Sequence, residues 1–373
     1  MTSSYKRATS NSRLIFLIFA TCLTMTAFSQ EHSRTIDFPD IPGYKTLKCD
    51  LHMHTVFSDG SVWPNIRVQE AVRDGLDAIC ITDHLEYQPK NKDIPHTDRN
   101  RSYQLASEAA EGQDLIVING AEITRSMPPG HSNAIFLEDV NRLNVDDPME
   151  AFKEAKRQGA FVFWNHPHWT SQQKDGVATL TEMHLELFSE GLINGIEVYN
   201  GHTYSDEALK IAHKHNLALL GNSDVHGLID WAHEVSDGGH RPVTLVFAEE
   251  KNEKSLKEAF QKQRSAVWFD NTLVGDQEFL GPLVEQSLKV SRLGKSLVQT
   301  LMIENISDAD YILENQSEYT LHNQSSVFVL KSHETTKIQV KTIEVLESFD
   351  LTFSVLNATT APGEHPKIQI HIQ

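Results

Sequence analysis

The chain has few cysteines and few positive charges. Only 3 of its 373 residues are cysteine, and Lys and Arg together number 33 against 51 Asp and Glu. Cys49 and Cys80 fall on expected core strands, where a disulfide between neighbouring parallel strands would have awkward geometry, so both are expected to be small buried apolar residues. Because acidic residues outnumber basic ones, the chain also lacks the positively charged surface that long nucleic acids require. We therefore expect no long nucleic acid as a partner.

The sequence also lacks an apolar run long enough for a confident membrane span. Leu14–Ala20 is apolar and follows Lys6, Arg7 and Arg13, and Ala27-Phe28-Ser29 fits a signal-peptidase site before Gln30. Residues 1–29 are thus predicted to be a cleaved signal peptide, which places the mature protein in the periplasm or outside the cell. A lipid anchor at Cys22 is disfavoured because Thr21 sits poorly before a lipidated cysteine. Cleavage moves the formal charge from −18 to −21 (30 − 51).

Two patterns divide the rest of the chain. Between residues 30 and 275, short apolar strands alternate with helical segments, which predicts an α/β fold with mainly parallel strands buried on both faces. The expected strands are Leu47–Thr55, Ala78–Asp83, Leu115–Glu122, Asn133–Leu137, Phe161–His166, Gly195–Tyr199, Leu217–Asp224 and Val243–Ala248. Residues 276–373 hold short β-branched segments separated by Asn, Ser, Asp and Gly, which predicts a small all-β, sandwich-like domain.

Histidines and acids recur where the expected strands end. Asp50-Leu51-His52-Met53-His54 is matched about 170 residues later by Asp224-Val225-His226, and side chains two apart on a strand point the same way. A single His-x-His is weak evidence, since His213/His215 in a polar helical run reads as surface. The further candidates Asp59, His84, Glu122, His131 and His166 each follow an apolar run. Ligands at the carboxyl ends of strands favour a barrel over an open sheet and indicate a multinuclear metallohydrolase.

The order of these motifs resembles the PHP (polymerase and histidinol phosphatase) family over roughly residues 46–275. The resemblance implies a distorted (β/α)7 TIM-like barrel that holds two or three divalent ions (Mn, Fe or Zn). It implies His52, His54, Glu122 and Asp224 as ligands of one metal; Glu122, His131 and His166 of a second; and Asp59, His84 and His226 of a third. Some members have a histidine near the position of Asp59. Asp50 is not a family ligand and is expected to orient an imidazole.

Other residues are candidates for contacting a substrate. Arg241 could grip phosphate oxygens or make a surface salt bridge, and His202 or Asn200 could contact substrate or form a strand-end turn. His168 could share the pocket with His166 or be an ordinary loop histidine. Four tryptophans near the motifs could wall a leaving-group pocket or pack in the core: Trp63, Trp164, Trp169 and Trp231.

These observations predict an exported metal-dependent phosphoesterase that hydrolyses small phosphate esters with a metal-bridged hydroxide. Glu122, Asp224, Arg241 and His202 are the expected catalytic residues. Export and the β tail resemble bacterial phosphodiesterases of the Sb-PDE type, which favours diesters. The alternatives are a phosphomonoesterase of the same family and a non-catalytic metal-binding scaffold or sensor. No stable membrane span is expected after signal cleavage, and the oligomeric state is left open.

Overall fold

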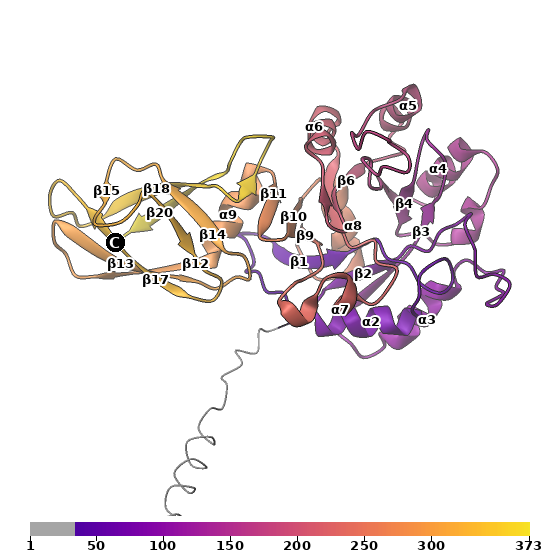
Figure 1. The fold of residues 1–373 in the computed structure, drawn as a ribbon, viewed down its shortest axis with the longest axis horizontal. Helices are drawn as coiled ribbons and strands as arrows, with labels where there is room; N and C mark the ends of the chain where they lie inside the picture. The colour runs from indigo at the N-terminus through magenta and orange to yellow at the C-terminus, as the bar shows by residue number, and fades with distance from the viewer. Residues whose placement is uncertain (1–33) are drawn as a thin grey trace, which may run out of the picture. The chain divides into compact units, whose positions relative to one another are not determined.

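The protein was analysed as a computed structural model, which describes residues 34–373 (Figure 1). The predicted signal peptide, its cleavage site and Cys22 lie outside these residues. None of the described helices combines the length and the apolar character that crossing a membrane demands.

The first part of the chain is built on a curled, twelve-stranded mixed sheet. Its strands run in the order β19-β11-β10-β9-β1-β2-β3-β4-β5-β6-β7, and β8 pairs with β6. The strands are β1 (Lys45–Asp50), β2 (Ala78–Ile81), β3 (Ile116–Ile123), β4 (Ser132–Ile135), β5 (Phe161–Trp164), β6 (Gly195–Asn200), β7 (Thr203–Tyr204), β8 (Ala218–Asn222), β9 (Val243–Ala248), β10 (Ser265–Phe269), β11 (Thr272–Gly275) and β19 (Ala358–Thr359). This curled sheet with its helices forms a TIM-like half-barrel, which confirms the predicted TIM-like α/β architecture.

The expectation of parallel strands holds for only part of the sheet. The pairs β1–β2, β2–β3, β5–β6 and β6–β8 are parallel, whereas β4 is antiparallel to both β3 and β5. The short segment 124–131 between β3 and β4 holds no helix, and a parallel pair needs a long crossover connection. β9 also runs antiparallel to β1 and β10.

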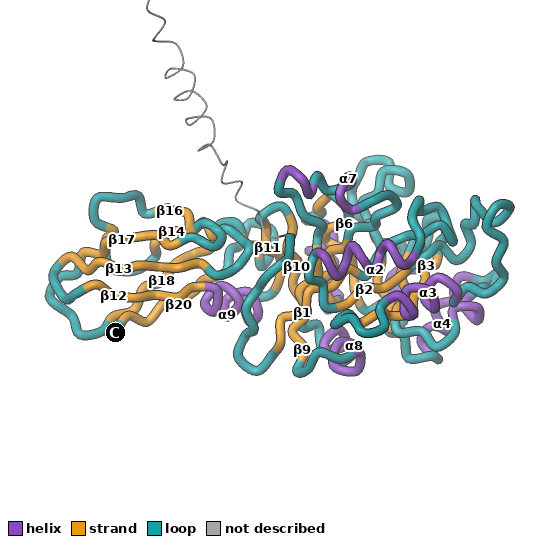
Figure 2. Tube along the Cα trace, turned by 90° about the horizontal axis from the view of Figure 1, so that it is seen from below, coloured by secondary structure: helices purple, strands orange, loops and turns teal. Residues whose placement is uncertain are grey.

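Helices pack along the sheet and connect its strands (Figures 1 and 2). Every residue of β2, β5 and β9 is buried, as expected for strands covered on both faces. Cys49 and Cys80 are fully buried free thiols, which confirms their predicted role as small core residues. The helices are α2 (Pro64–Arg73), α3 (Arg101–Ala109), α4 (Pro148–Arg157), α5 (Glu182–Ser189), α6 (Asp206–His215), α7 (Ile229–Ala232) and α8 (Glu253–Gln261), with the 3-10 turns η1 (Val140–Leu143) and η2 (Val235–Asp237).

The C-terminal residues form the predicted all-β domain after α9 (Gln277–Ser287). Two antiparallel four-stranded sheets have the orders β12-β13-β17-β15 and β16-β14-β18-β20 (Figure 2). Their strands are β12 (Leu288–Leu293), β13 (Val298–Asn305), β14 (Tyr311–Asn315), β15 (Thr320–Leu321), β16 (Val327–Leu330), β17 (Thr335–Lys341), β18 (Phe349–Val355) and β20 (Lys367–Ile372). Burial alternates along β20, as in a sheet with one solvated face.

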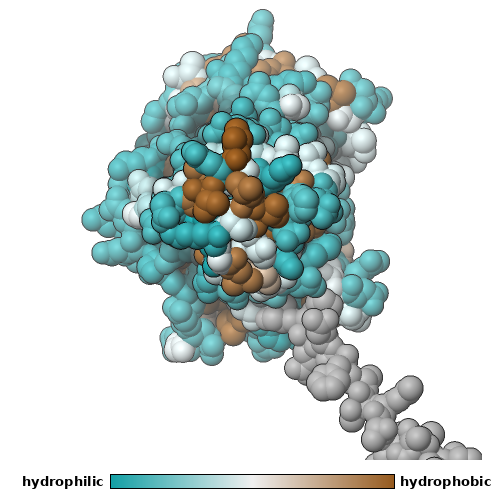
Figure 3. Space-filling model, turned by 90° about the vertical axis from the view of Figure 1, so that its left-hand side faces the viewer, coloured by the Kyte–Doolittle hydropathy of each residue, from teal (hydrophilic) through white to brown (hydrophobic). Residues whose placement is uncertain are grey.

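The C-terminal domain lends one strand to the half-barrel and exposes apolar side chains elsewhere. β19 pairs in parallel with β11, where Leu273 faces Ala358. Figure 3 shows apolar side chains gathered on the end of the C-terminal domain. Exposed apolar residues of its loops and strand ends include Leu293, Leu297, Ile343 and Val345.

Candidate metal centre

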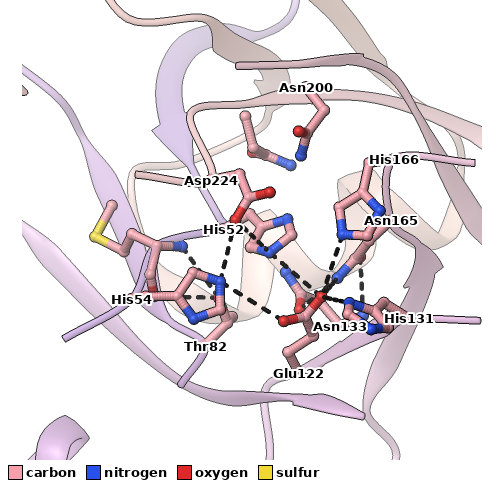
Figure 4. A network of polar contacts seen from close by, with 12 residues as sticks. His52, His54, Thr82, Glu122, His131, Asn133, Asn165, His166, Asn200 and Asp224 are labelled. Atoms are coloured by element: carbon pink, nitrogen blue, oxygen red, sulfur yellow. Dashed lines mark hydrogen bonds and ion pairs between the residues drawn. The ribbon is translucent and has the colours of Figure 1, made fainter. Parts of the chain in front are cut away.

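The two halves of the ligand pattern lie side by side. The His54 amide donates to the Val225 carbonyl (3.0 Å), and the Asp224 amide donates to the His52 carbonyl (2.8 Å). This pairing brings the Nε2 atoms of both histidines close to Asp224 Oδ1, at 3.2 Å for His52 and 3.1 Å for His54 (Figure 4). The segment that follows β1 therefore shares a site with the segment that follows β8.

Glu122, near the end of β3, is the centre of the cluster. Its side chain is fully buried, yet nitrogens of five imidazoles lie 2.6–3.6 Å from its two oxygens. The five are His52, His54, His84, His131 and His166. A carboxylate so placed can bridge two cations, which is the role that the resemblance implies for it.

Asp59 forms a second, more open part of the cluster. Its carboxylate lies 3.2 Å from His226 Nε2 and 3.4 Å from His84 Nε2. His54 also approaches this part, because its ring stacks on that of His226 with centroids 4.2 Å apart. All nine predicted ligands are thus brought together.

The grouping of the ligand atoms differs in part from the implied one. Four sets of atoms each fit within 4.8 Å: His54, Asp59, His84 and His226; His52, His54 and Glu122; His52, His166 and Asp224; and His84, Glu122 and His131. His84, assigned by resemblance only to the third metal, also lies beside Glu122. His54 likewise extends toward the Asp59 group.

Unpaired atoms show that these residues suit a cation. His52 Nε2, His54 Nε2 and Glu122 Oε2 are buried and make no well-aligned hydrogen bond among the described residues. Each nevertheless faces a neighbour of opposite type: Asp224 Oδ1 lies 3.2 and 3.1 Å from the two nitrogens, and His84 Nδ1 lies 2.6 Å from the oxygen. Unpaired buried polar atoms are costly and uncommon in folded proteins. Divalent ions would satisfy all three at once, and mixed imidazole and carboxylate donors suit Mn, Fe and Zn. The cluster therefore fits more than one divalent metal.

The charges in the cluster agree with this fit. Burial alone would raise the pKa of Glu122 and of Asp224, but the surrounding imidazoles hold both values well below the usual range. Burial would lower the pKa of His52, but Asp224 and Glu197 raise it to about 10. The His84 pKa is raised to about 11 by Glu122 and Asp59 against the effect of burial. Protons or metal ions must therefore balance the carboxylates.

Glu197, on β6, orients His52 and His166 through hydrogen bonds. Its Oε1 accepts from His52 Nδ1 (2.9 Å), and its Oε2 accepts from the His166 amide (2.8 Å). Asn200 and Asn222 each donate a further hydrogen bond to it. Donation to Glu197 leaves His52 Nε2 free for a metal. The sequence showed Glu197 at the end of a strand but gave no reason to assign it this role.

Arg67, on α2, holds the two ligand segments together, a role that was not predicted from the sequence. The fully buried guanidinium donates to the carbonyls of His54 (2.9 and 3.0 Å), Val225 (3.0 Å) and Gly227 (2.7 Å). It also pairs with Glu70 at 2.8 Å. The i,i+3 spacing of Arg67 and Glu70 was the available signal, but such pairs are ordinary on exposed helices.

Backbone geometry places some ligands in unusual conformations. His166 and Asp224 have φ values of 29° and 50°, which cost non-glycine residues about 1–3 kcal/mol and persist where neighbours enforce them. Glu197 enforces the first by accepting from the His166 amide. Gly60 permits a close approach, because a Cβ there would lie 2.6 Å from the His54 carbonyl carbon.

Two sequence-based roles are contradicted. Arg241 cannot reach a phosphate, because its fully buried guanidinium pairs with Asp50 (3.1 Å) and Asp74 (2.6 Å). Asp50 does not orient an imidazole: besides Arg241 it accepts from the amide and hydroxyl of Ser223. Arg241 and Asp50 instead form a buried ion pair next to the ligand segments. Sequence could not separate a buried ion pair from an anion-binding arginine.

The remaining substrate candidates lie at different places. Asn200 borders the cluster (Figure 4), and His168 Nε2 contacts Thr203 Oγ1 at 2.8 Å. His202 is exposed, and its Nε2 donates to the Ala232 carbonyl at 2.7 Å. Trp164 is buried against His184 and therefore belongs to the core. Substrate contact by His202 remains a prediction.

A curled half-barrel with a buried cluster of histidines and acids at its strand ends defines a class of metal-binding α/β protein. A model described as the PHP domain matches residues 50–265, and one described as an Ig-like domain matches residues 287–371. The chain belongs to the PHP domain family. No curated protein matches it.

Solved structures include one close relative. A crystal structure from Bacteroides vulgatus, described as a two-domain protein containing a predicted PHP-like metal-dependent phosphoesterase, is 41% identical, with a TM-score of 0.85 over 91% of this chain and 98% of that one. PsfC from Pseudomonas syringae is 16% identical, with a TM-score of 0.41 over 60% of this chain and 92% of that one. An amidohydrolase from Chromobacterium violaceum is 16% identical, with a TM-score of 0.36 over 48% and 87%. The last two are too distant to support an argument.

Replacing Glu197 should weaken metal binding. In Glu197→Gln an amide NH2 would face donors that now meet a carboxylate, so we expect metal affinity to fall about 10- to 100-fold. Competition with a chromophoric chelator measures this. Glu186→Gln, at an exposed position of α5, is the matched control. An unchanged affinity in Glu197→Gln would exclude the orienting role.

Removing the Arg67 guanidinium should destabilise the fold. Arg67→Met leaves Glu70 buried without its partner and frees three carbonyls, so the free energy of unfolding should drop by about 3–5 kcal/mol. Urea denaturation of metal-stripped protein measures this drop. Arg73→Met, at the exposed end of the same helix, should change it by less than about 0.5 kcal/mol. Equal effects of the two substitutions would contradict the assignment.

Metal uptake should release protons. Because the pKa values of His52 and His84 are raised to about 10 and 11, both imidazoles are protonated at neutral pH in the metal-free protein and must lose a proton to bind. Apparent affinity should therefore weaken roughly tenfold per pH unit lowered for each proton released. Calorimetry in buffers of different ionisation enthalpy counts the protons. Binding without proton release would show that these imidazoles are not protonated in the metal-free protein.

Proposed function

We propose that the protein is an exported metal-dependent phosphoesterase that hydrolyses small phosphate esters, with diesters preferred. The observation that carries this proposal is the convergence of nine ligand side chains around buried, unpaired donor atoms. The PHP match and the relative from Bacteroides vulgatus, described as containing a metal-dependent phosphoesterase, support the reaction class.

The cluster is open on one side. The side chains of His52, His54 and Glu122 are fully buried, whereas those of Asp59, Asp224 and His226 are 26%, 19% and 40% exposed. A phosphate group can therefore approach over this second set of residues. When bound, divalent ions acidify water and offset the negative charge of phosphate oxygens.

The protein's own residues hold this arrangement fixed. Glu197 and the Asp224 carboxylate set the orientation of His52, and Arg67 keeps the His54 and Val225 backbones adjacent. Ligands held in this way do not reorganise when charge develops on the phosphate. Rigid placement of the ligands is thus the main contribution of the fold to the reaction.

Net charge favours diesters over monoesters. The chain carries a formal charge of −18, which repels a dianionic monoester more strongly than a monoanionic diester. The pairing of Arg241 with two acids also removes one expected site for an extra phosphate charge. Export rests on the sequence of residues 1–29 alone.

Loss of the Asp224 carboxylate should abolish turnover. In Asp224→Asn the charge that faces His52 and His54 disappears, so hydrolysis of bis-p-nitrophenyl phosphate should fall at least about 100-fold, with a parallel loss of bound metal. Release of p-nitrophenol and elemental analysis measure both effects. Asp93→Asn, at an exposed loop position, should retain wild-type activity.

Chelation and a monoester complete the test. A chelator should stop hydrolysis, and added metal should restore it. Faster turnover of p-nitrophenyl phosphate than of the diester would overturn the diester preference. A folded, metal-loaded protein that cleaves neither ester would favour the scaffold or sensor and refute the phosphoesterase.

A further inference from the structure

Exposed aromatic residues follow the ligand motifs. Among the described residues, the large aromatic side chains left exposed are Trp63, Tyr87, Trp169 and Trp231. They come three to five positions after Asp59, His84, His166 and His226, respectively. A single exposed aromatic residue needs no explanation. Their shared position a few residues after a ligand motif does need one.

Two of these rings touch the metal cluster directly. The Trp169 ring lies 5.5 Å from His131 and 5.2 Å from His166, centroid to centroid, and is 43% exposed. The Tyr87 ring lies 5.7 Å from His84 and is 52% exposed. His84 and His131 are themselves neighbours at 5.7 Å. Tyr87 and Trp169 therefore border two adjacent imidazoles.

Packing does not account for these two rings. Trp164 and Trp268 show what core tryptophans do in this chain: both are buried, against His184 and His240 respectively. By contrast, about half of the Tyr87 and Trp169 surface remains in contact with solvent, while the imidazoles that they touch are at most 9% exposed. Each ring thus packs one side against imidazoles of the cluster and keeps the rest of its surface free for a ligand.

We propose that Tyr87 and Trp169 bind a flat aromatic group of the substrate while its phosphate lies over the metal cluster. This rests on the proposed function and narrows the substrate class to phosphate esters that carry an aryl group or a nucleobase. Aromatic rings pair in stacked or edge-to-face geometries that an alkyl group cannot reproduce. The metal cluster selects the phosphate, and the two rings select the group attached to it.

Phosphonates test this binding without turnover. Their P–C bond is not hydrolysed, so affinity for the Mn²⁺-loaded protein can be measured by calorimetry even if every ester proves inert. We expect phenylphosphonate to bind roughly five- to tenfold more tightly than methylphosphonate. Cyclohexylphosphonate, which has similar bulk without a flat ring, should bind close to methylphosphonate. An acyclic phosphonate that carries adenine distinguishes the two kinds of aromatic group. Tighter binding than phenylphosphonate indicates a nucleobase preference, and weaker binding indicates an aryl preference.

Substitutions of single aromatic residues test which rings cause the preference for phenylphosphonate. Trp169→Ala and Tyr87→Ala should each lower the phenyl-to-methyl affinity ratio at least about threefold, with metal content and methylphosphonate affinity unchanged. Trp169→Phe should retain most of the ratio. Trp231→Ala, which removes a ring that is 80% exposed on α7, should leave the ratio unaltered. A ratio near one in the wild type, an equal gain for cyclohexylphosphonate, or no effect of either alanine variant would overturn the proposal.

Discussion

Burying an ionised carboxylate is the constraint on which this structure depends. Glu122 is fully enclosed, and an enclosed carboxylate persists only when opposite charges or donors surround it. Five imidazoles from four segments of the chain meet this requirement, since His52 and His54 both follow β1. In the metal-free protein, protons on imidazoles such as His52 and His84 balance the carboxylates. Divalent cations can take the place of these protons, because the same nitrogens and oxygens are metal ligands.

The same physics extends to a second layer of buried charges. Arg67 with Glu70, and Arg241 with Asp50 and Asp74, are ion pairs enclosed below the ligand segments. They fix backbone carbonyls and amides that carry the ligands, and they neutralise acids that would otherwise compete for a cation. The backbone of the loops that hold the ligands is thus fixed by hydrogen bonds to buried side chains.

The metal centre combines buried polar residues with aromatic residues that are partly exposed. Its buried acids and imidazoles suit cations and phosphate, whereas Trp169 and Tyr87 offer half-exposed rings beside His131 and His84. Reaction chemistry and substrate choice therefore rest on different residues. Substrate range can change through loop aromatics while the ligand set, which is tied to strand positions, stays fixed.

The sequence by itself predicted the TIM-like α/β fold, the β domain and the nine residues of the cluster. Period-two spacing and the ends of apolar runs are local patterns, so they can be recognised without the tertiary structure. The expectation of mainly parallel strands was wrong for β4, although the short connection before it already excludes a crossover. The sequence could not distinguish Arg241 from a phosphate ligand, or find Glu197 and Arg67. The role of a charged side chain depends on what faces it across the fold, and only the tertiary structure brings those partners together.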